Sequence, residues 1–139
     1  MFVGKPSRWL MISALLAVAA CADIRKLTYP PEYVYIEKTE LQSSMHQMAA
    51  AMSRLDSLVA TESTGDSTQK DVLAQLNVID QVAWKLSGGK STNHLLLDGH
   101  MKQFSADVAK ARLLASSSPP NYYYAGRLSG NCSGCHRFR

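Results

Sequence analysis

Cysteine is scarce in this chain, with only Cys21, Cys132 and Cys135 among its 139 residues. Two of the three lie close together near the C-terminus, and the third lies near the other end. A small exported domain that depends on disulfides needs several pairs spread along the chain. The cysteine pattern therefore excludes a disulfide-rich scaffold, and it offers no second cysteine pair of the kind that many zinc domains use.

A strong charge of one sign is also absent. The chain has 15 Lys and Arg against 11 Asp and Glu. Two of the basic residues, Lys5 and Arg8, fall in a segment that we expect to be removed, which leaves a net charge of about +2. No basic stripe with interleaved aromatic residues is present. These features argue against a nucleic-acid partner.

The first 20 residues have the pattern of an export signal. Lys5 and Arg8 precede an apolar run, Trp9 to Ala20, which ends in small residues. This run is too short to span a bilayer of ~30 Å hydrocarbon thickness comfortably as a helix. We therefore expect residues 1–20 to be removed from the mature protein.

The stretch Val18-Ala19-Ala20-Cys21 resembles a lipobox, the cleavage and acylation signal of bacterial lipoproteins. The resemblance implies that Cys21 becomes the lipidated first residue, and several acyl chains would anchor the protein stably. Ala22 stands where an Asp would resemble an inner-membrane retention signal, so the outer membrane is favoured. The alternative is ordinary secretion with cleavage at an Ala, which would leave Cys21 incidental.

The rest of the chain lacks the two-residue alternation of half-buried strands and instead repeats apolar residues every three or four positions. Residues 21–38, with two consecutive prolines at Pro30 and Pro31, are expected to form an extended tether. Residues 39–139 are expected to form one all-α domain, an antiparallel up-down-up-down four-helix bundle.

Four helical segments are predicted in this domain. The first opens with a capping box, Thr39-Glu40-Leu41-Gln42, and its apolar stripe is Leu41, Met45, Met48, Met52, Leu55 and Val59. The second starts near Thr68 and ends at Ser87-Gly88-Gly89. The third runs from about Asn93 to Ala115. The fourth begins at Pro120 or Asn121 and carries Tyr124, Leu128, Cys132 and Cys135. Trp84 is expected in the core or at the edge of the bundle.

The strongest chemical signal is Cys132-Ser133-Gly134-Cys135-His136, a C-x-x-C-H motif. On a helix, positions i, i+3 and i+4 share one face, so Cys132 and Cys135 can bond the two vinyl groups of one haem. The adjacent imidazole of His136 then reaches the iron. The motif is typical of c-type haem attachment. A zinc site would need a fourth ligand, and a thioredoxin-like pair would need a βαβ context; both alternatives stay open.

The bundle topology predicts which residues lie opposite the motif. The end of the fourth helix lies level with the start of the first, so Met45 and His136 belong near one end on facing stripes. Leu41, Leu86, Leu97 and Met101 are expected to line the same cavity. Met45 is the leading candidate for a sixth, distal iron ligand, although either His94 or His100 could bind iron and the position could be empty. His46 is expected to face solvent.

The chain resembles the cytochrome c′ family of four-helix-bundle c-type cytochromes. The resemblance is carried by the terminal position of Cys132 to His136, the Phe138-Arg139 ending and Gln42-Ser43-Ser44-Met45. In this resemblance Met45, the last residue of the third feature, implies the Met-ligated, six-coordinate, low-spin branch of electron carriers. Two departures are Leu41, where the family usually has Arg, and a single residue between His136 and Phe138, where the family usually has two.

Together these features predict one covalent haem c near one end of the bundle, in a lipid-anchored cytochrome that transfers electrons in the bacterial periplasm and is not an enzyme. The expected partners are periplasmic or membrane redox proteins, the cytochrome c maturation machinery and, through Cys21, the membrane; a homodimer is left open. The alternative is a five-coordinate haem protein that binds NO or CO. A third hypothesis is a lipoprotein without haem whose thiols hold zinc or exchange disulfides.

Overall fold

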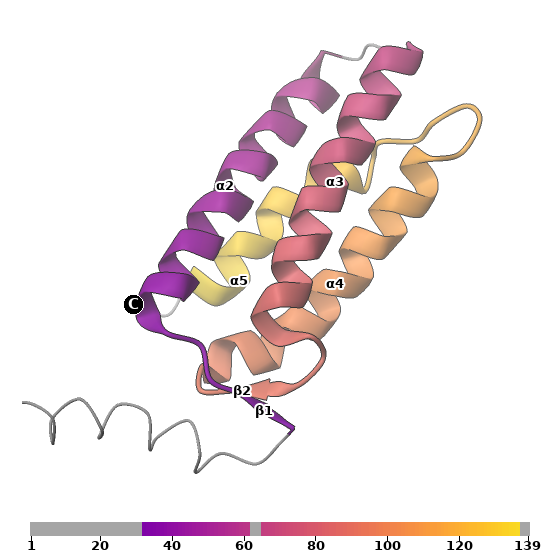
Figure 1. Ribbon diagram of the computed structural model, residues 1–139. Coiled ribbons are helices and arrows are strands. Elements are labelled where there is room, and N and C mark those ends of the chain that lie inside the picture. Colours follow the sequence, from indigo (N-terminus) through magenta and orange to yellow (C-terminus); the bar gives the residue numbers. More distant parts are fainter. Residues whose placement is uncertain (1–31, 62–64, 137–139) are drawn as a thin grey trace, which may run out of the picture.

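The computed structural model describes residues 32–61 and 65–136 (Figure 1). Three long helices follow one another in antiparallel order: α2 (Lys38–Ala60), α3 (Asp66–Ser87) and α4 (Leu95–Ala115). A fourth rod returns along them and is made of the 3-10 helix η1 (Ala125–Asn131) and the short helix α5 (Cys132–His136). Because η1 packs against both α2 and α4, the four rods enclose one core. The predicted all-α up-down bundle is confirmed.

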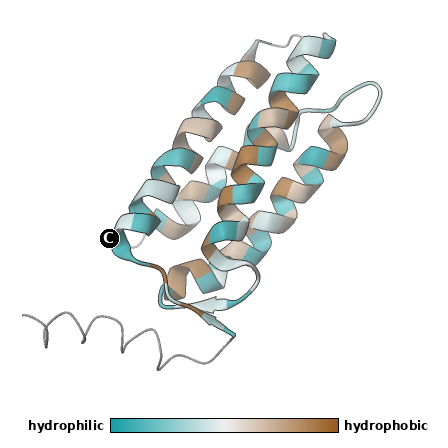
Figure 2. Ribbon diagram, in the orientation of Figure 1, coloured by the Kyte–Doolittle hydropathy of each residue, from teal (hydrophilic) through white to brown (hydrophobic). Residues whose placement is uncertain are grey.

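The core consists of the apolar stripes that the sequence predicts. Leu55, Val72, Leu76, Ile79 and Val108 are completely buried. Burying a side chain of this size contributes about 1.5–3 kcal/mol, so these positions account for much of the stability. In Figure 2 every long helix carries both hydrophobic and hydrophilic segments, as an amphipathic helix must.

The ends of the helices agree with the prediction in some places and not in others. Gly88 adopts φ +50° and donates its N–H to the Trp84 carbonyl at 2.7 Å, so α3 ends where the glycine pair predicts. The predicted capping box is wrong. Glu37 is the N-cap of α2, no side chain caps that end, and Thr39 lies inside the first turn. Ile36, the residue before this N-cap, is held by tertiary contacts.

These contacts fasten the end of the predicted tether to the loop between α3 and α4. The strand β1 (Tyr33–Val34) pairs in parallel with β2 (Ser91–Thr92). The Asn93 side chain accepts from the Ile36 N–H at 2.8 Å and donates to the Ile36 carbonyl at 3.0 Å. Ile36 itself is only 3% exposed. Two-residue strands are too short for any alternation to predict them, and the tether before residue 32 lies outside the described residues.

The predicted fourth helix is replaced by a shorter, tighter element. Residues 120–124 are not helical, and a 3-10 helix precedes the five residues of α5. A Cβ added at Gly126 would lie 3.1 Å from Val59 Cγ1. Glycine thus lets η1 approach α2 closely, and both Gly126 and Gly130 lower α-helix propensity in this stretch.

Among the described residues, none of the helices combines the length and the apolar character that crossing a membrane requires.

Candidate functional site

The C-x-x-C-H motif forms the whole of α5, so its two thiols and its imidazole follow the helical spacing that the sequence predicts. The hydroxyl of Ser133 donates to the Gly130 carbonyl at 2.8 Å and ties the motif to the end of η1. Cys132 and His136 are exposed, and Cys135 is half-buried. Both thiols are free. The motif therefore presents its reactive atoms at the surface of the bundle.

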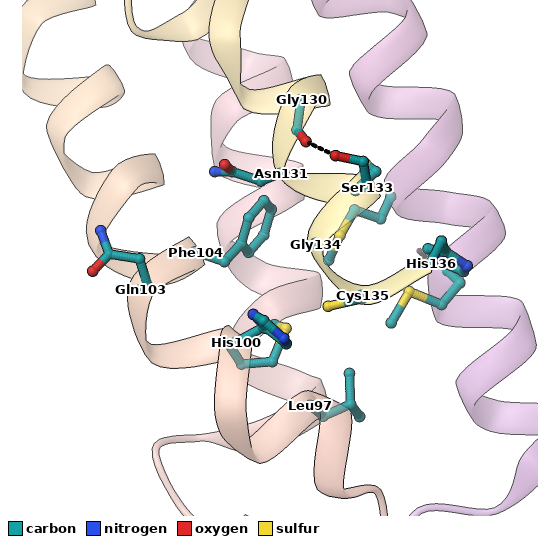
Figure 3. Close-up of a pocket in the computed structure, with 14 residues that line it drawn as sticks. Leu97, His100, Gln103, Phe104, Gly130, Asn131, Ser133, Gly134, Cys135 and His136 are labelled. Atoms are coloured by element: carbon teal, nitrogen blue, oxygen red, sulfur yellow. Dashed lines mark hydrogen bonds between the residues drawn. The ribbon is translucent and has the colours of Figure 1, made fainter. Parts of the chain in front are cut away.

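The motif borders a cavity of about 250 Å³ between α2, α4 and α5, which we call the motif cavity. The residues that line it divide into an apolar wall and a more polar rim. Figure 3 shows His100 and Phe104 of α4 facing the turn that carries Cys135, with His136 lying on the opposite side of that turn. The lining residues are Met45, Met48, Leu97, His100, Met101, Gln103, Phe104 and residues 130–136.

Met45 borders the motif cavity together with His136, as the topology predicts. Met45 is half-buried, whereas Met48, one turn further along α2, is buried and also borders the cavity. The expectation that Leu97 and Met101 line the cavity is confirmed. Leu41 and Leu86 do not line it, and that expectation is wrong: Leu86 packs in the general core and Leu41 packs against it.

The histidines have different surroundings. His100 borders the motif cavity and lies so close to the motif that a Cβ added at Gly134 would be 3.8 Å from its Nδ1. His94 Nε2 instead lies 3.3 Å from the Ile36 carbonyl oxygen, and this residue does not line the cavity. His46 is exposed, as predicted. His100 is thus the only imidazole besides His136 among the residues that line the cavity.

A small polar network holds the start of α5 against α4. Gln103 Nε2 donates to Asp107 Oδ1 at 2.9 Å, and Asn131 Nδ2 donates to Asp107 Oδ2 at 3.0 Å. Asn131 immediately precedes Cys132, so the network fixes the position at which the motif begins. Sequence reasoning missed Gln103 and Asn131; only the four-residue spacing of Gln103 and Asp107 on one helix could have indicated the first contact.

Thiol exchange finds little support in this geometry. Burial, and secondarily the negative charge of a nearby Cys132 thiolate, raise the pKa of the Cys135 thiol. A raised pKa keeps the thiol protonated near neutral pH, whereas redox-active pairs have a lowered pKa. Within residues 32–61 and 65–136, no three His, Cys, Asp or Glu side chains are placed to hold one metal ion, so the zinc alternative finds no ready cluster.

Comparison with known proteins identifies no family for this chain. No family model, curated protein or solved structure matches this chain. The structure by itself shows a small all-α domain of four packed helical rods. The predicted signal segment, Cys21 and the Phe138-Arg139 ending lie outside the described residues.

Proposed function

We propose that this chain is a monohaem c-type cytochrome that resembles the cytochrome c′ family, is anchored to the membrane through Cys21 and carries electrons in the periplasm. One observation carries the proposal. Cys132, Cys135 and His136 of α5 border the same cavity as Met45 of α2, although these elements come from opposite ends of the domain sequence. An isolated chance match to the motif would not require such an apolar, partly enclosed neighbourhood.

The residues present suit a haem group. Its flat faces are apolar, and the wall of the motif cavity offers Met48, Leu97, Met101 and Phe104. The volume of about 250 Å³ lies just below the ~300–1,000 Å³ typical of ligand sites. The motif cavity borders exposed residues of α5, and α5 buries none of its own side chains, so the site is open to the surface on that side.

The roles of the side chains follow from their chemistry. Cys132 and Cys135 would hold the group through thioether bonds, and His136 and Met45 would bind its iron. Haem supplies a reversible one-electron couple when bound. Met and His ligation together favours a raised reduction potential.

The remaining cavity residues control access and orientation. Met48, Met101 and Phe104 are buried and would exclude water, which lowers the local dielectric and limits rearrangement when the charge changes. The Asp107 network would hold the motif against α4. With both His136 and Met45 as ligands, the iron would have no position left for a substrate, and we therefore propose an electron carrier and not an enzyme.

The test is to purify the protein from cells that carry out c-type cytochrome maturation. We expect red material whose mass exceeds that of the polypeptide by one haem, with the haem retained after acid-acetone extraction. Replacing Cys132 and Cys135 with Ser should abolish the attachment. Material matured in this way whose two thiols are free, or are joined to each other, would disprove the proposal.

The distal ligand is tested separately with Met45→Ala. The oxidised wild-type protein should show the weak far-red Met–iron absorption band, and the variant should lose it and become high-spin. Its potential should fall by on the order of 0.1 V, within the ~0.8 V range that axial ligands span. Met48→Ala is the matched control and should keep the band. A wild-type protein that is already high-spin and binds NO or CO rapidly would favour the gas-binding alternative.

A further inference from the structure

A second hollow lies along α4 and adjoins the motif cavity. It is bordered by Trp84 from the last turns of α3, Lys90 from the following loop and Lys102 from α4. Leu97 and Met101 border both this hollow and the motif cavity. One layer of apolar side chains therefore separates the candidate haem site from this part of the surface, which we call the Trp84 groove.

Trp84 is unusually exposed for its size. Its side chain is 71% exposed, so the alternative that placed it in the core is wrong. Its Cε2 would lie 4.0 Å from a Cβ added at Gly88, which places the indole beside the turn that ends α3. A large exposed aromatic side chain costs free energy in water, and Trp is the residue most enriched among the energetic centres of protein interfaces.

The groove is lined by two positively charged side chains and one negatively charged side chain. Lys90 and Lys102 are exposed, and neither forms an ion pair within the described parts of the chain. Asp98, the acidic residue of the groove, directs both carboxylate oxygens at the Thr92 N–H, at 2.8 and 3.0 Å. Lys85 close by is already paired with Glu40 at 3.3 Å. Two ammonium groups beside an exposed indole are thus available to a partner.

We infer that the Trp84 groove is the docking surface for an acidic electron-transfer protein. The inference rests on the proposed function and names the partner's chemistry: an apolar contact for Trp84 surrounded by carboxylates that meet Lys90 and Lys102. In the exchange, one electron passes between the haem site and the partner's redox centre, and no covalent bond forms or breaks. Opposite charges steer such encounters and raise association rates at low salt.

The charge part is tested by stopped-flow oxidation of the reduced holo-protein at low ionic strength, with ferricyanide as an anionic probe and a tris-phenanthroline cobalt(III) complex as a cationic one. The variant is Lys90→Glu with Lys102→Glu. The control, Arg54→Glu with Lys70→Glu, changes the net charge equally at exposed positions toward the other end of the bundle. We expect the groove variant to lower the rate constant for oxidation by ferricyanide at least about fivefold, and the control to lower it less than about twofold. Both differences should be lost at high salt.

The aromatic part uses an acidic blue-copper protein as the probe. Trp84→Leu should lower the second-order rate constant at least about threefold while the absorption spectrum and the potential stay unchanged. Tyr123→Leu, at another aromatic residue that is 59% exposed, is the matched control and should leave the rate constant within about 1.5-fold.

The outcomes separate this inference from the proposed function. Colourless protein without haem would disprove the proposed function. Red, normally reducible protein whose groove variants exchange electrons as fast as their controls would overturn the docking surface alone. Binding to vesicles of anionic lipid that is lost in the groove variant, with electron-exchange rates unchanged, would also overturn it and would assign the surface to the membrane.

Discussion

At the scale of single residues, two neighbouring tyrosines have different hydrogen bonding. The hydroxyl of Tyr124 accepts from Lys110 Nζ at 2.7 Å, and the same ammonium lies 4.0 Å from the centre of the Tyr124 ring. The hydroxyl of Tyr122 is buried and has no hydrogen-bond partner in the described part of the chain. Both Tyr122 and Tyr124 are partly buried and pack against the core.

This difference predicts opposite effects of removing the two hydroxyls. Tyr122→Phe should raise the free energy of unfolding by about 1 kcal/mol, because a buried polar group without a partner is lost. Tyr124→Phe should lower it by about 0.5 kcal/mol, because a hydrogen bond is lost at an accessible site. Urea unfolding followed by circular dichroism measures both. A destabilised Tyr122→Phe would mean that the hydroxyl has a partner in solution.

The motif thiols illustrate what a residue pattern can predict. The spacing of Cys132, Cys135 and His136 predicts helical presentation on one face, and α5 confirms it. The position of His100 beside the motif cannot be predicted in this way, because its closeness to Gly134 depends on how α4 packs against α5. The face of a helix on which a residue lies depends on local sequence spacing, whereas its neighbours across a cavity depend on how the helices pack.

At the scale of elements, the attachment of β1 to the loop before α4 is the least expected feature. Asn93 satisfies both the N–H and the carbonyl of Ile36, and His94 Nε2 lies close to the same carbonyl. The loop leads directly into Leu97, which borders the motif cavity. The same few contacts therefore hold both the segment from β1 to Ile36 and the loop that leads to the wall of the motif cavity.

We predict that Asn93→Ala loosens this attachment. Two buried or half-buried backbone groups would lose their partner, and the free energy of unfolding should fall by about 1–3 kcal/mol. Amide hydrogen exchange of residues 33–36 should accelerate more than that of α3. Ser91→Ala, which shortens an exposed side chain in β2, should change the stability by less than about 0.5 kcal/mol. Equal exchange in the two variants would contradict the role of Asn93.

The fourth rod shows how tertiary contacts can override a local pattern. Leu128 continues the predicted apolar spacing and is buried, yet the segment around it is a 3-10 helix. Gly126 lies against Val59, so the close approach of η1 to α2 sets the path of the backbone. The periodicity predicted which side chain is buried but not the geometry of the helix that buries it.

At the scale of the whole molecule, the first described strand and the C-x-x-C-H motif come from opposite ends of the described sequence but lie toward the same end of the bundle. β1 packs beside β2 at the end of the bundle where α4 starts, and the motif cavity is bordered by the first turns of α4. The chain therefore enters the described domain at the end of the bundle that carries the motif cavity.

We predict that Cys21→Ser moves the protein from the membrane fraction to the soluble fraction, changing the ratio of the two at least about tenfold, because the acyl chains supply nearly all of the membrane affinity. Immunoblots of fractionated cells measure the ratio. Cys132→Ser is the control and should leave the protein in the membrane fraction, since it affects haem attachment and not acylation. A Cys21→Ser protein that stays with the membrane would disprove lipid anchoring.

The sequence by itself determined the amphipathic stripes, the end of α3 at Gly88 and the helical spacing of the motif, because each depends on residues within a few positions of one another. Only the tertiary structure decided that His100 borders the motif cavity, that Ile36 is held by Asn93 and that Trp84 lies exposed beside two lysines. These relations join residues far apart in the chain. They depend on how helices pack, which short-range periodicity does not encode.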